Sequence, residues 1–349
     1  MDFDVSGGLS FGHRGCKSRL TQGDSRCQER NTTGTVVSTS NMSLEVYRKN
    51  ITTNCGEGPH WDARTNTLLF VDIGNGDVHR LHYTTGQDEI KHFDNMVGFI
   101  IPRKAGGYMT GIGRTISHFD WDSGTVTALA EVDQGLPTQL NDAKCDASGR
   151  LWTVTFLFFK GSMAQIDGAY LAPNLGALYS FSKDQKLTKH VDKITLSNGM
   201  DWTDDNRTMY YIDTMSRQVW AYDFDIGAGS ISNKRTVVDF GGSETMDTLG
   251  LPDGMTIDYN GHIWVTCYGV GKVACFDPET GKSVRTIELP DAKHITSCCF
   301  GGPNMDELFV TSSTHHLNPQ VKSEQPLAGS LFRITGLGVK GRPAYIYEG

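Results

Sequence analysis

A short pattern of two strands and two turns recurs six times along this chain of 349 residues. Each copy begins with an apolar or aromatic strand, followed by a tight turn, a second strand and a turn that contains Asp or Gly. The copies start near residues 68, 108, 151, 209, 263 and 308, and are therefore roughly 40 to 58 residues apart. This spacing is typical of a four-stranded propeller blade with connecting loops of variable length.

Further apolar runs between the copies supply the remaining strands of each unit. Examples are VGFIIP from Val97 and TSCCF from Thr296. No long segment has the 3.6-residue period of a helix, and the 40 glycines fit a chain with many tight turns. The sequence therefore predicts an all-β fold, a six-bladed β-propeller of four-stranded antiparallel blades. We expect the LEVY run at Leu44 to pair with the last blade, so that the ring has no exposed edge at its seam.

The repeats set the predicted domain boundaries. Residues 42–349 are predicted to form a single propeller domain. Residues 1–41 are polar, rich in Ser, Thr, Gly and Arg, and without periodicity, so they are predicted to be a disordered extension. Eight scattered cysteines without an apolar leader predict reduced thiols in the cytoplasm. We expect a monomer.

Charge and hydropathy exclude two classes of partner. The net charge of −8 comes with no basic face of the kind that binds nucleic acid. No run of about 18 apolar residues could span a membrane. The expected partner is a small molecule.

Four short segments just before blade strands carry oxygen-bearing side chains. They read CGEGPHW, QLNDAKCD, SNGMDW and LPDGMTID, and they supply Glu57, Asn141, Asn198 and Asp253. Each segment alone is weak evidence, because Asn-Gly and Asp-Gly are also ordinary turn dipeptides. Together they belong to the first, third, fourth and fifth blades, and the symmetry of a propeller points such positions at one axis.

This set of oxygen atoms predicts one divalent metal ion on the axis. Carboxylate and carboxamide oxygens suit Ca²⁺, Mg²⁺ or Mn²⁺. Zn²⁺ is less favoured, because His60 has no His or Cys partner at ligand spacing. Residues 42–349 also contain no G-x-S-x-G elbow for a covalent acyl-enzyme.

Longer stretches around these segments closely resemble the senescence-marker-protein/gluconolactonase/luciferin-regenerating family of six-bladed propellers. The densest matches are CGEGPHWDARTNTLLFVDI, SNGMDWTDDNRTMYYIDT and LPDGMTIDYNGHIWVTCYG, and the resemblance runs from about residue 44 to the end of the chain. It implies that Glu57, Asn198 and Asp253 are the metal ligands. It also implies hydrolysis of aldonolactones such as gluconolactone, calcium binding, and a location in the cytosol and possibly the nucleus.

Two positions depart from the family pattern. Gln139 replaces the arginine of the Arg-x-Asn-Asp substrate segment, while Asn141 is kept. Phe159 stands where relatives carry a substrate-binding acid. The first change removes a fixed charge with a fork of donors, and the second replaces a hydroxyl acceptor with an apolar ring. We therefore expect weaker recognition of polyhydroxylated sugars and a smaller loss for a less polar ester or lactone.

The main hypothesis is a sugar lactone hydrolase that depends on one divalent ion (Ca²⁺, Zn²⁺, Mn²⁺ or Mg²⁺) and also binds calcium. Asp253 is the candidate catalytic base, and Asn141 and Gln139 are the candidate substrate-binding residues. The loop pair His315-His316 is predicted to lie at the surface and outside the site. Two alternatives stay open: a non-catalytic calcium-binding regulatory protein with a degraded lactonase site, and an aryl-ester or organophosphate hydrolase.

Overall fold

A computed structural model describes residues 42–157, 164–166, 169–171, 174–242, 245–315 and 317–349. The predicted disordered extension, residues 1–41, and the departure at Phe159 lie outside these residues. Strands dominate the described part, and the helical elements are short: η1 (Ile73–Asn75), η2 (Thr214–Ser216), α1 (Met246–Leu249) and α2 (Pro319–Glu324). Among the described residues, no helix is long and apolar enough to cross a membrane.

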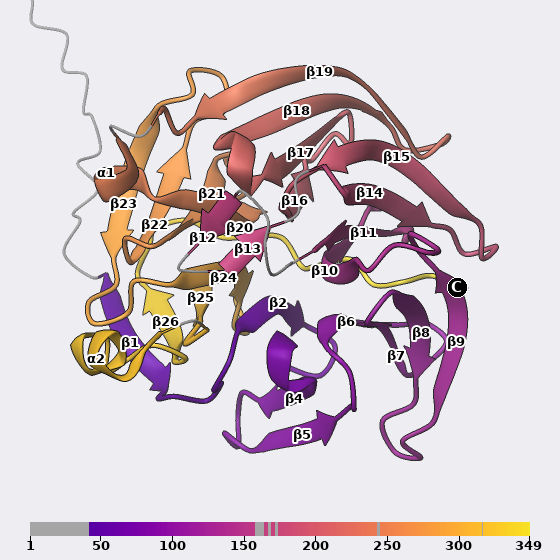
Figure 1. The fold of residues 1–349 in the computed structure, drawn as a ribbon, viewed down its shortest axis with the longest axis horizontal. Helices are drawn as coiled ribbons and strands as arrows, with labels where there is room; N and C mark the ends of the chain where they lie inside the picture. The colour runs from indigo at the N-terminus through magenta and orange to yellow at the C-terminus, as the bar shows by residue number, and fades with distance from the viewer. Residues whose placement is uncertain (1–41, 158–163, 167–168, 172–173, 243–244, 316) are drawn as a thin grey trace, which may run out of the picture. The chain divides into compact units, whose positions relative to one another are not determined.

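Six four-stranded antiparallel sheets form a six-bladed propeller (Figure 1). The first sheet contains β2 (Gly56–Asp62), β3 (Thr67–Asp72), β4 (Asp77–His82) and β5 (Asp88–His92). The second contains β6 (Val97–Pro102), β7 (Tyr108–Ile112), β8 (Thr115–Phe119) and β9 (Val126–Glu131). The third contains β10 (Gln139–Cys145), β11 (Leu151–Phe156), β14 (Gly176–Phe181) and β15 (Leu187–Ile194).

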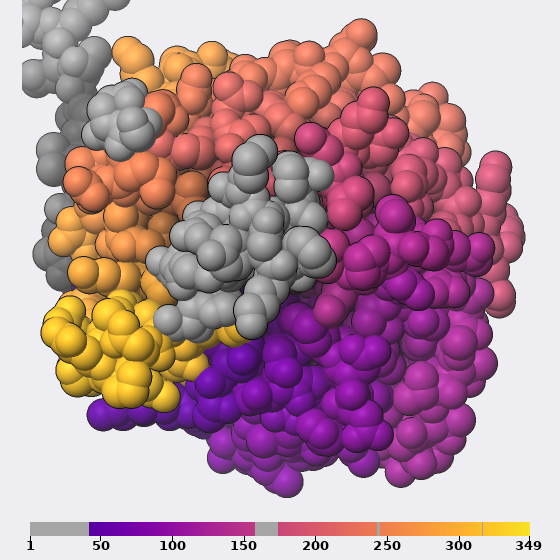
Figure 2. Space-filling view, viewed as in Figure 1, coloured from indigo at the N-terminus to yellow at the C-terminus, as the bar shows by residue number. Residues whose placement is uncertain are grey.

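The other three sheets continue the ring in chain order, as the colours of the space-filling view show (Figure 2). The fourth contains β16 (Ser197–Trp202), β17 (Thr208–Asp213), β18 (Gln218–Asp225) and β19 (Ser230–Asp239). The fifth contains β20 (Leu251–Ile257), β21 (Ile263–Tyr268), β22 (Lys272–Phe276) and β23 (Ser283–Glu288). The sixth contains β24 (Ile295–Gly301), β25 (Glu307–Ser312), β26 (Leu331–Thr335) and β1 (Ser43–Arg48).

The predicted fold class and blade count are confirmed, and so is the closure of the ring. β1 pairs antiparallel with β26, and Leu44 lies opposite Ile334. The sixth sheet is thus completed by the first strand of the described chain, which leaves no unpaired edge at the seam. The repeat seen in the sequence corresponds to the two middle strands of each blade. A separate two-stranded hairpin, β12 (Ala164–Ile166) and β13 (Ala169–Leu171), is inserted between β11 and β14.

Burial decreases from the axis outward. Inner and outer strands of a blade therefore have different sequence patterns. The second strands β3, β11 and β25 have apolar side chains on both faces because neighbouring blades cover them on both sides. The outermost strand β19 is mostly exposed and polar. Large side chains fill the space between blades; Trp61 of the first blade, for example, stacks on Phe309 of the sixth with ring centroids 5.7 Å apart.

Every innermost strand carries a register shift near its middle. The shifts fall between Glu57 and His60 in β2, and at the corresponding places in β6, β10, β16, β20 and β24. Such a bulge bends the strand and changes the direction of the side chains beside it. The six inner strands contact one another in a closed ring, so the shifts occur at one level around the axis.

The last ten residues cross the end of the ring at which the inner strands finish. They bridge five blades through short hydrogen bonds. The bonds run from Tyr259 N to Lys340 O, from Gly341 N to Met305 O, from Arg342 Nη2 to Trp202 O, from Tyr347 N to Pro102 O and from Glu348 N to Gly149 O. This C-terminal segment therefore ties together blades that are distant in the sequence.

Candidate metal centre

The four predicted oxygen-bearing side chains line one cavity. Glu57, Asn141, Asn198 and Asp253 all face a space of ≈ 700 Å³, which includes the volume open to solvent at its mouth. We call it the site cavity. Each residue lies near the start of the inner strand of its blade, so the segments belong to the inner strands β2, β10, β16 and β20 rather than to loops before them. Radial symmetry brings them together, as the sequence predicted.

The glycines that follow two of these residues serve close packing rather than turns. A Cβ at Gly199 would lie 2.5 Å from Met255 N, and a Cβ at Gly254 would lie 2.1 Å from Ser297 Oγ. Neither glycine has a positive φ. Neighbouring inner strands approach so closely at the axis that only glycine fits there. The glycines of the Asn-Gly and Asp-Gly pairs are thus explained by the narrow channel at the axis.

A chain of hydrogen bonds fixes the orientation of the Asn198 carboxamide. Its Nδ2 donates to Thr214 Oγ1 at 2.9 Å, and this hydroxyl donates in turn to Pro252 O at 2.8 Å. Asn141 Nδ2 donates to Asn198 Oδ1 at 3.2 Å and to Ser197 O at 2.8 Å. Oδ1 is the only acceptor of the Asn198 carboxamide. The hydrogen bond from Nδ2 to Thr214 fixes the direction in which this oxygen points.

The electrostatics of the site cavity fit a cation. Glu57 and Asp253 are only 5% and 7% exposed. Burial, together with the charges of Asp253 and Asp142, raises the pKa of Glu57 well above its usual value; burial and the Asp142 charge do the same to the pKa of Asp253. Within the described chain, no hydrogen-bond donor reaches the Asp253 carboxylate, and Glu57 accepts one hydrogen bond from Gly58 N at 2.8 Å. Buried carboxylates without a cationic partner are costly, and a divalent ion would remove that cost.

Two side chains are not where the sequence placed them. Gln139, predicted to bind substrate, does not line the site cavity; it lines a separate hollow with Arg114 and Glu131. Its Oε1 is buried without a hydrogen-bond partner among the residues that the structure describes. His315, predicted to lie at the surface away from the site, is half-buried and lines the site cavity. The loop before α2 turns inward at Ser313, whose hydroxyl accepts from His315 N at 2.9 Å.

Sequence reasoning also missed Thr214 and Tyr268, which line the site cavity. Thr214 directly follows the buried strand β17, and a polar residue at the end of a buried strand was the signal available. Tyr268 ends β21, and its hydroxyl lies 3.2 Å from His294 Nδ1, with the two rings stacked. No local pattern marks this pair, because the two residues come from different blades.

Comparison with known proteins agrees with this architecture. The sequence profile of the SMP-30/Gluconolactonase/LRE-like region matches residues 55–314, a span that includes the four cavity residues. The chain belongs to this family. Among curated members, regucalcin of Danio rerio is 41% identical over 296 residues, which cover 84% of this chain and 95% of the relative. Regucalcin of Homo sapiens is 41% identical over 297 residues, with coverage of 84% and 95%.

Solved structures of the family have the same fold. A luciferin-regenerating enzyme superposes with a TM-score of 0.79 at 32% identity, covering 88% of this chain and all of that enzyme. A calcium-binding protein, regucalcin, from Agrobacterium tumefaciens superposes with a TM-score of 0.76 at 26% identity, with coverage of 86% and 97%. The family relationship therefore extends over nearly the whole propeller.

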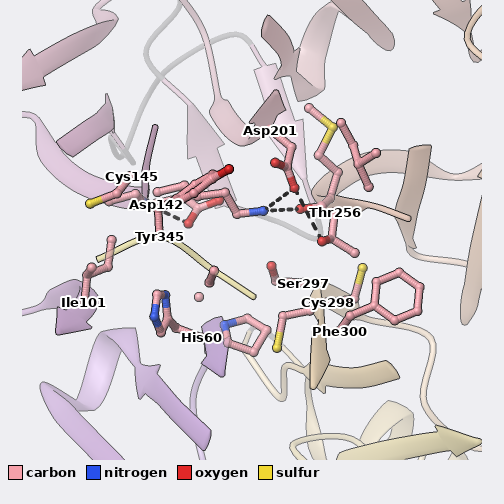
Figure 3. A pocket seen from close by; sticks show the side chains of 18 of the residues that line it. His60, Ile101, Asp142, Cys145, Asp201, Thr256, Ser297, Cys298, Phe300 and Tyr345 are labelled. Atoms are coloured by element: carbon pink, nitrogen blue, oxygen red, sulfur yellow. Dashed lines mark hydrogen bonds and ion pairs between the residues drawn. The ribbon is translucent and has the colours of Figure 1, made fainter. Parts of the chain in front are cut away.

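A second cavity lies along the later halves of the same inner strands, next to the C-terminal segment. We call this space of ≈ 740 Å³ the far cavity; Figure 3 shows Asp201, Thr256 and His60 around it. Lys144 Nζ lies 2.7 Å from Asp201 Oδ2 and donates to Met255 O at 3.3 Å. The far cavity thus contains a cationic side chain of the protein, the Lys144 ammonium group.

A group formed by Asp258, His262 and Cys275 has ligand atoms within 4.8 Å of one another. Asp258 Oδ1 accepts from the backbone of Asn260 and His262, and its Oδ2 accepts from Trp264 Nε1 at 2.9 Å. Burial raises the pKa of Cys275 to about 12, which opposes a thiolate ligand.

The same arrangement recurs in the third blade. There Asp146 accepts from the backbone of Ser148 and Arg150 and from Trp152 Nε1. Since the pattern is repeated without His or Cys, bracing of a turn accounts for the position of Asp258 without a metal ion.

Proposed function

We propose that this chain is a divalent-metal-dependent lactone hydrolase that also binds calcium. One observation carries the proposal: two buried carboxylates and an oriented carboxamide oxygen converge in a cavity whose described lining contains no Lys or Arg. Glu57, Asn198 and Asp253 would hold the ion. Kinship with gluconolactonases supports the reaction, and the name of the calcium-binding Agrobacterium tumefaciens relative supports the ion.

A bound divalent ion would polarise the lactone carbonyl and lower the pKa of water beside it. The protein residues do the rest. Asn141 holds the water, or a hydroxyl group of the lactone, through its Oδ1, because its Nδ2 donates to Ser197 and Asn198. Asp253 accepts a proton as the oxygen of water bonds to the carbonyl carbon. The ring C–O bond then breaks, and the proton passes to the ring oxygen, so that lactone and water give one hydroxy acid.

A second candidate is a calcium-binding protein without catalysis. The position of Gln139 favours this candidate. The resemblance leads us to expect a substrate-binding residue at this position, but the Gln139 side chain lies outside the site cavity. In that case the carboxylates would bind Ca²⁺ in the same way, but no lactone would be turned over.

The test is lactone hydrolysis with Ca²⁺, Zn²⁺, Mn²⁺ or Mg²⁺ added to the metal-free protein. The substrates are D-glucono-δ-lactone and unsubstituted δ-valerolactone. We expect metal-dependent turnover that is lost in Asp253→Ala and kept in Asp223→Ala, a matched carboxylate that is exposed on the outer part of a blade. Ca²⁺ binding without turnover of either lactone would overturn the hydrolase and support the second candidate.

A further inference from the structure

The mouth of the site cavity is lined by apolar side chains from five blades. These residues are Ile73, Met96, Phe156, Leu196, Leu251 and the ring of Tyr268. Phe156 and Leu196 pair across the third and fourth blades through an isolated bridge, and Met215 packs against them. A ligand in the cavity therefore contacts hydrocarbon from these blades, while Asn54, Ser313 and His315 line the cavity elsewhere.

Apolar and polar residues occupy two levels of the cavity. Leu196 stands two residues before Asn198, and Leu251 stands two residues before Asp253. All four side chains line the site cavity, and in each pair the apolar residue precedes the polar one at the start of the inner strand. The carbonyl-binding groups thus form the floor, while the wall that would face the substituents of a ring is apolar.

The Ser and Thr hydroxyls of the cavity donate to backbone carbonyls of the protein. Thr214 Oγ1 donates to Pro252 O at 2.8 Å, Thr296 Oγ1 donates to Gly56 O at 2.5 Å, and Ser313 Oγ donates to Asn54 O at 3.0 Å. None can donate to a substrate hydroxyl without giving up a backbone partner. A site selects a hydroxylated substrate through polar groups that it leaves available, and these three hydroxyls offer no free donor.

From this arrangement we infer that the lactone hydrolysed here carries a hydrocarbon side chain in place of the ring hydroxyls of a sugar lactone. The inference rests on the proposed lactone hydrolase and specifies its substrate class. The carbonyl lies at the polar floor, and the alkyl chain packs against the apolar wall at the mouth. Each methylene that leaves water in this way favours binding roughly threefold to fourfold.

A substrate series with one ring tests the inference on the metal-loaded protein. The series is δ-valerolactone, δ-hexalactone, δ-octalactone and δ-decalactone, compared with D-glucono-δ-lactone. We expect kcat/KM to rise with each methylene and δ-decalactone to exceed D-glucono-δ-lactone by at least roughly tenfold. A flat series, or a preference for D-glucono-δ-lactone, would overturn the substrate class and leave the hydrolase intact; no turnover of any lactone would overturn both.

Variants of the wall sharpen the test. Phe156→Asn should lower the gain in kcat/KM per methylene to less than about twofold, whereas the matched Phe156→Leu should keep it. An unchanged slope in Phe156→Asn would contradict the assigned wall. Stabilisation by Ca²⁺ in a thermal melt confirms that each variant is folded, and Leu251→Asn gives an independent test from the fifth blade.

Discussion

The two cavities on the axis are built from the same six strands, yet they handle buried charge in opposite ways. In the far cavity, Asp201 lies 2.7 Å from the Lys144 ammonium group, and the C-terminal segment lies against the space. In the site cavity, Glu57 and Asp253 face a space whose described lining contains no Lys or Arg. The comparison teaches that a lysine of the protein offsets the buried charge at one end of the channel, whereas we propose that an ion does so at the other.

The largest expected effect is on the free energy of unfolding, from a substitution in the C-terminal segment at the far cavity. Tyr347 is 2% exposed, stacks on Phe181 and donates its hydroxyl to Ser182 O at 2.7 Å. Tyr347→Ala should lower the free energy of unfolding by about 3–5 kcal/mol, measured by urea denaturation. Ca²⁺ affinity in the folded variant should stay within about twofold.

Tyr259→Ala is the control for this prediction, because Tyr259 is 60% exposed. It should change the free energy of unfolding by less than about 0.5 kcal/mol. If Tyr347→Ala weakened Ca²⁺ binding more than tenfold, the division between a structural end and a binding end would be wrong.

The next prediction is that two Asp→Asn substitutions change the free energy of unfolding in opposite directions. In metal-free protein, Asp201→Asn leaves Lys144 without its charged partner and should lower the free energy of unfolding by about 1–3 kcal/mol. Asp253→Asn removes a carboxylate that has no cation and should raise the free energy of unfolding by about 1–3 kcal/mol at pH 8. Thermal melts in chelator measure both. Destabilisation by both substitutions would contradict the comparison.

Substitutions of Thr214 test whether the protein positions the Asn198 carboxamide to bind an ion. Thr214→Val removes the hydroxyl that holds Asn198 Nδ2, so the carboxamide can rotate. The Kd for Ca²⁺, measured by calorimetry, should rise by about 10-fold, at the lower end of what such supporting contacts contribute. Thr214→Ser keeps the hydroxyl and should bind Ca²⁺ as the wild type does; equal loss in both variants would refute the positioning role.

The smallest effect is the pH dependence of the difference between wild type and Asp253→Asn. The pKa of Asp253 is raised in the folded protein, so its contribution to stability is fully present below the unfolded pKa and is lost as pH rises through the folded pKa. The stability gap in chelator should therefore be widest at pH 8 and close toward pH 4. The lowered pKa of His60, about 4, acts in the opposite direction in both proteins and cancels in the difference. A gap that widened on acidification would contradict this reasoning.

Much of the architecture was predictable because each blade repeats one local pattern and symmetry does the rest. The six sheets and the closure by Leu44 follow from strand spacing. The convergence of Glu57, Asn141, Asn198 and Asp253 in one cavity follows from the place of their segments at the starts of inner strands. The position of Gln139 outside the site cavity could not be read from the sequence, because the bulge after Leu140 in β10 has no reliable local signal. The role of Gln139 in substrate binding stays a prediction. The inward position of His315 depends on packing between distant segments, as does the Lys144–Asp201 pair. The domain boundary at residue 42 and the disorder of residues 1–41 stay predictions.

The most direct test of the central claim is a crystal structure of the protein grown with Ca²⁺, with anomalous data collected near the calcium edge. We expect one ion on the axis, with oxygens of Glu57, Asn198 and Asp253 at about 2.3–2.6 Å. An ion bound at Asp258 instead, or no anomalous peak between these three side chains at saturating Ca²⁺, would contradict the account.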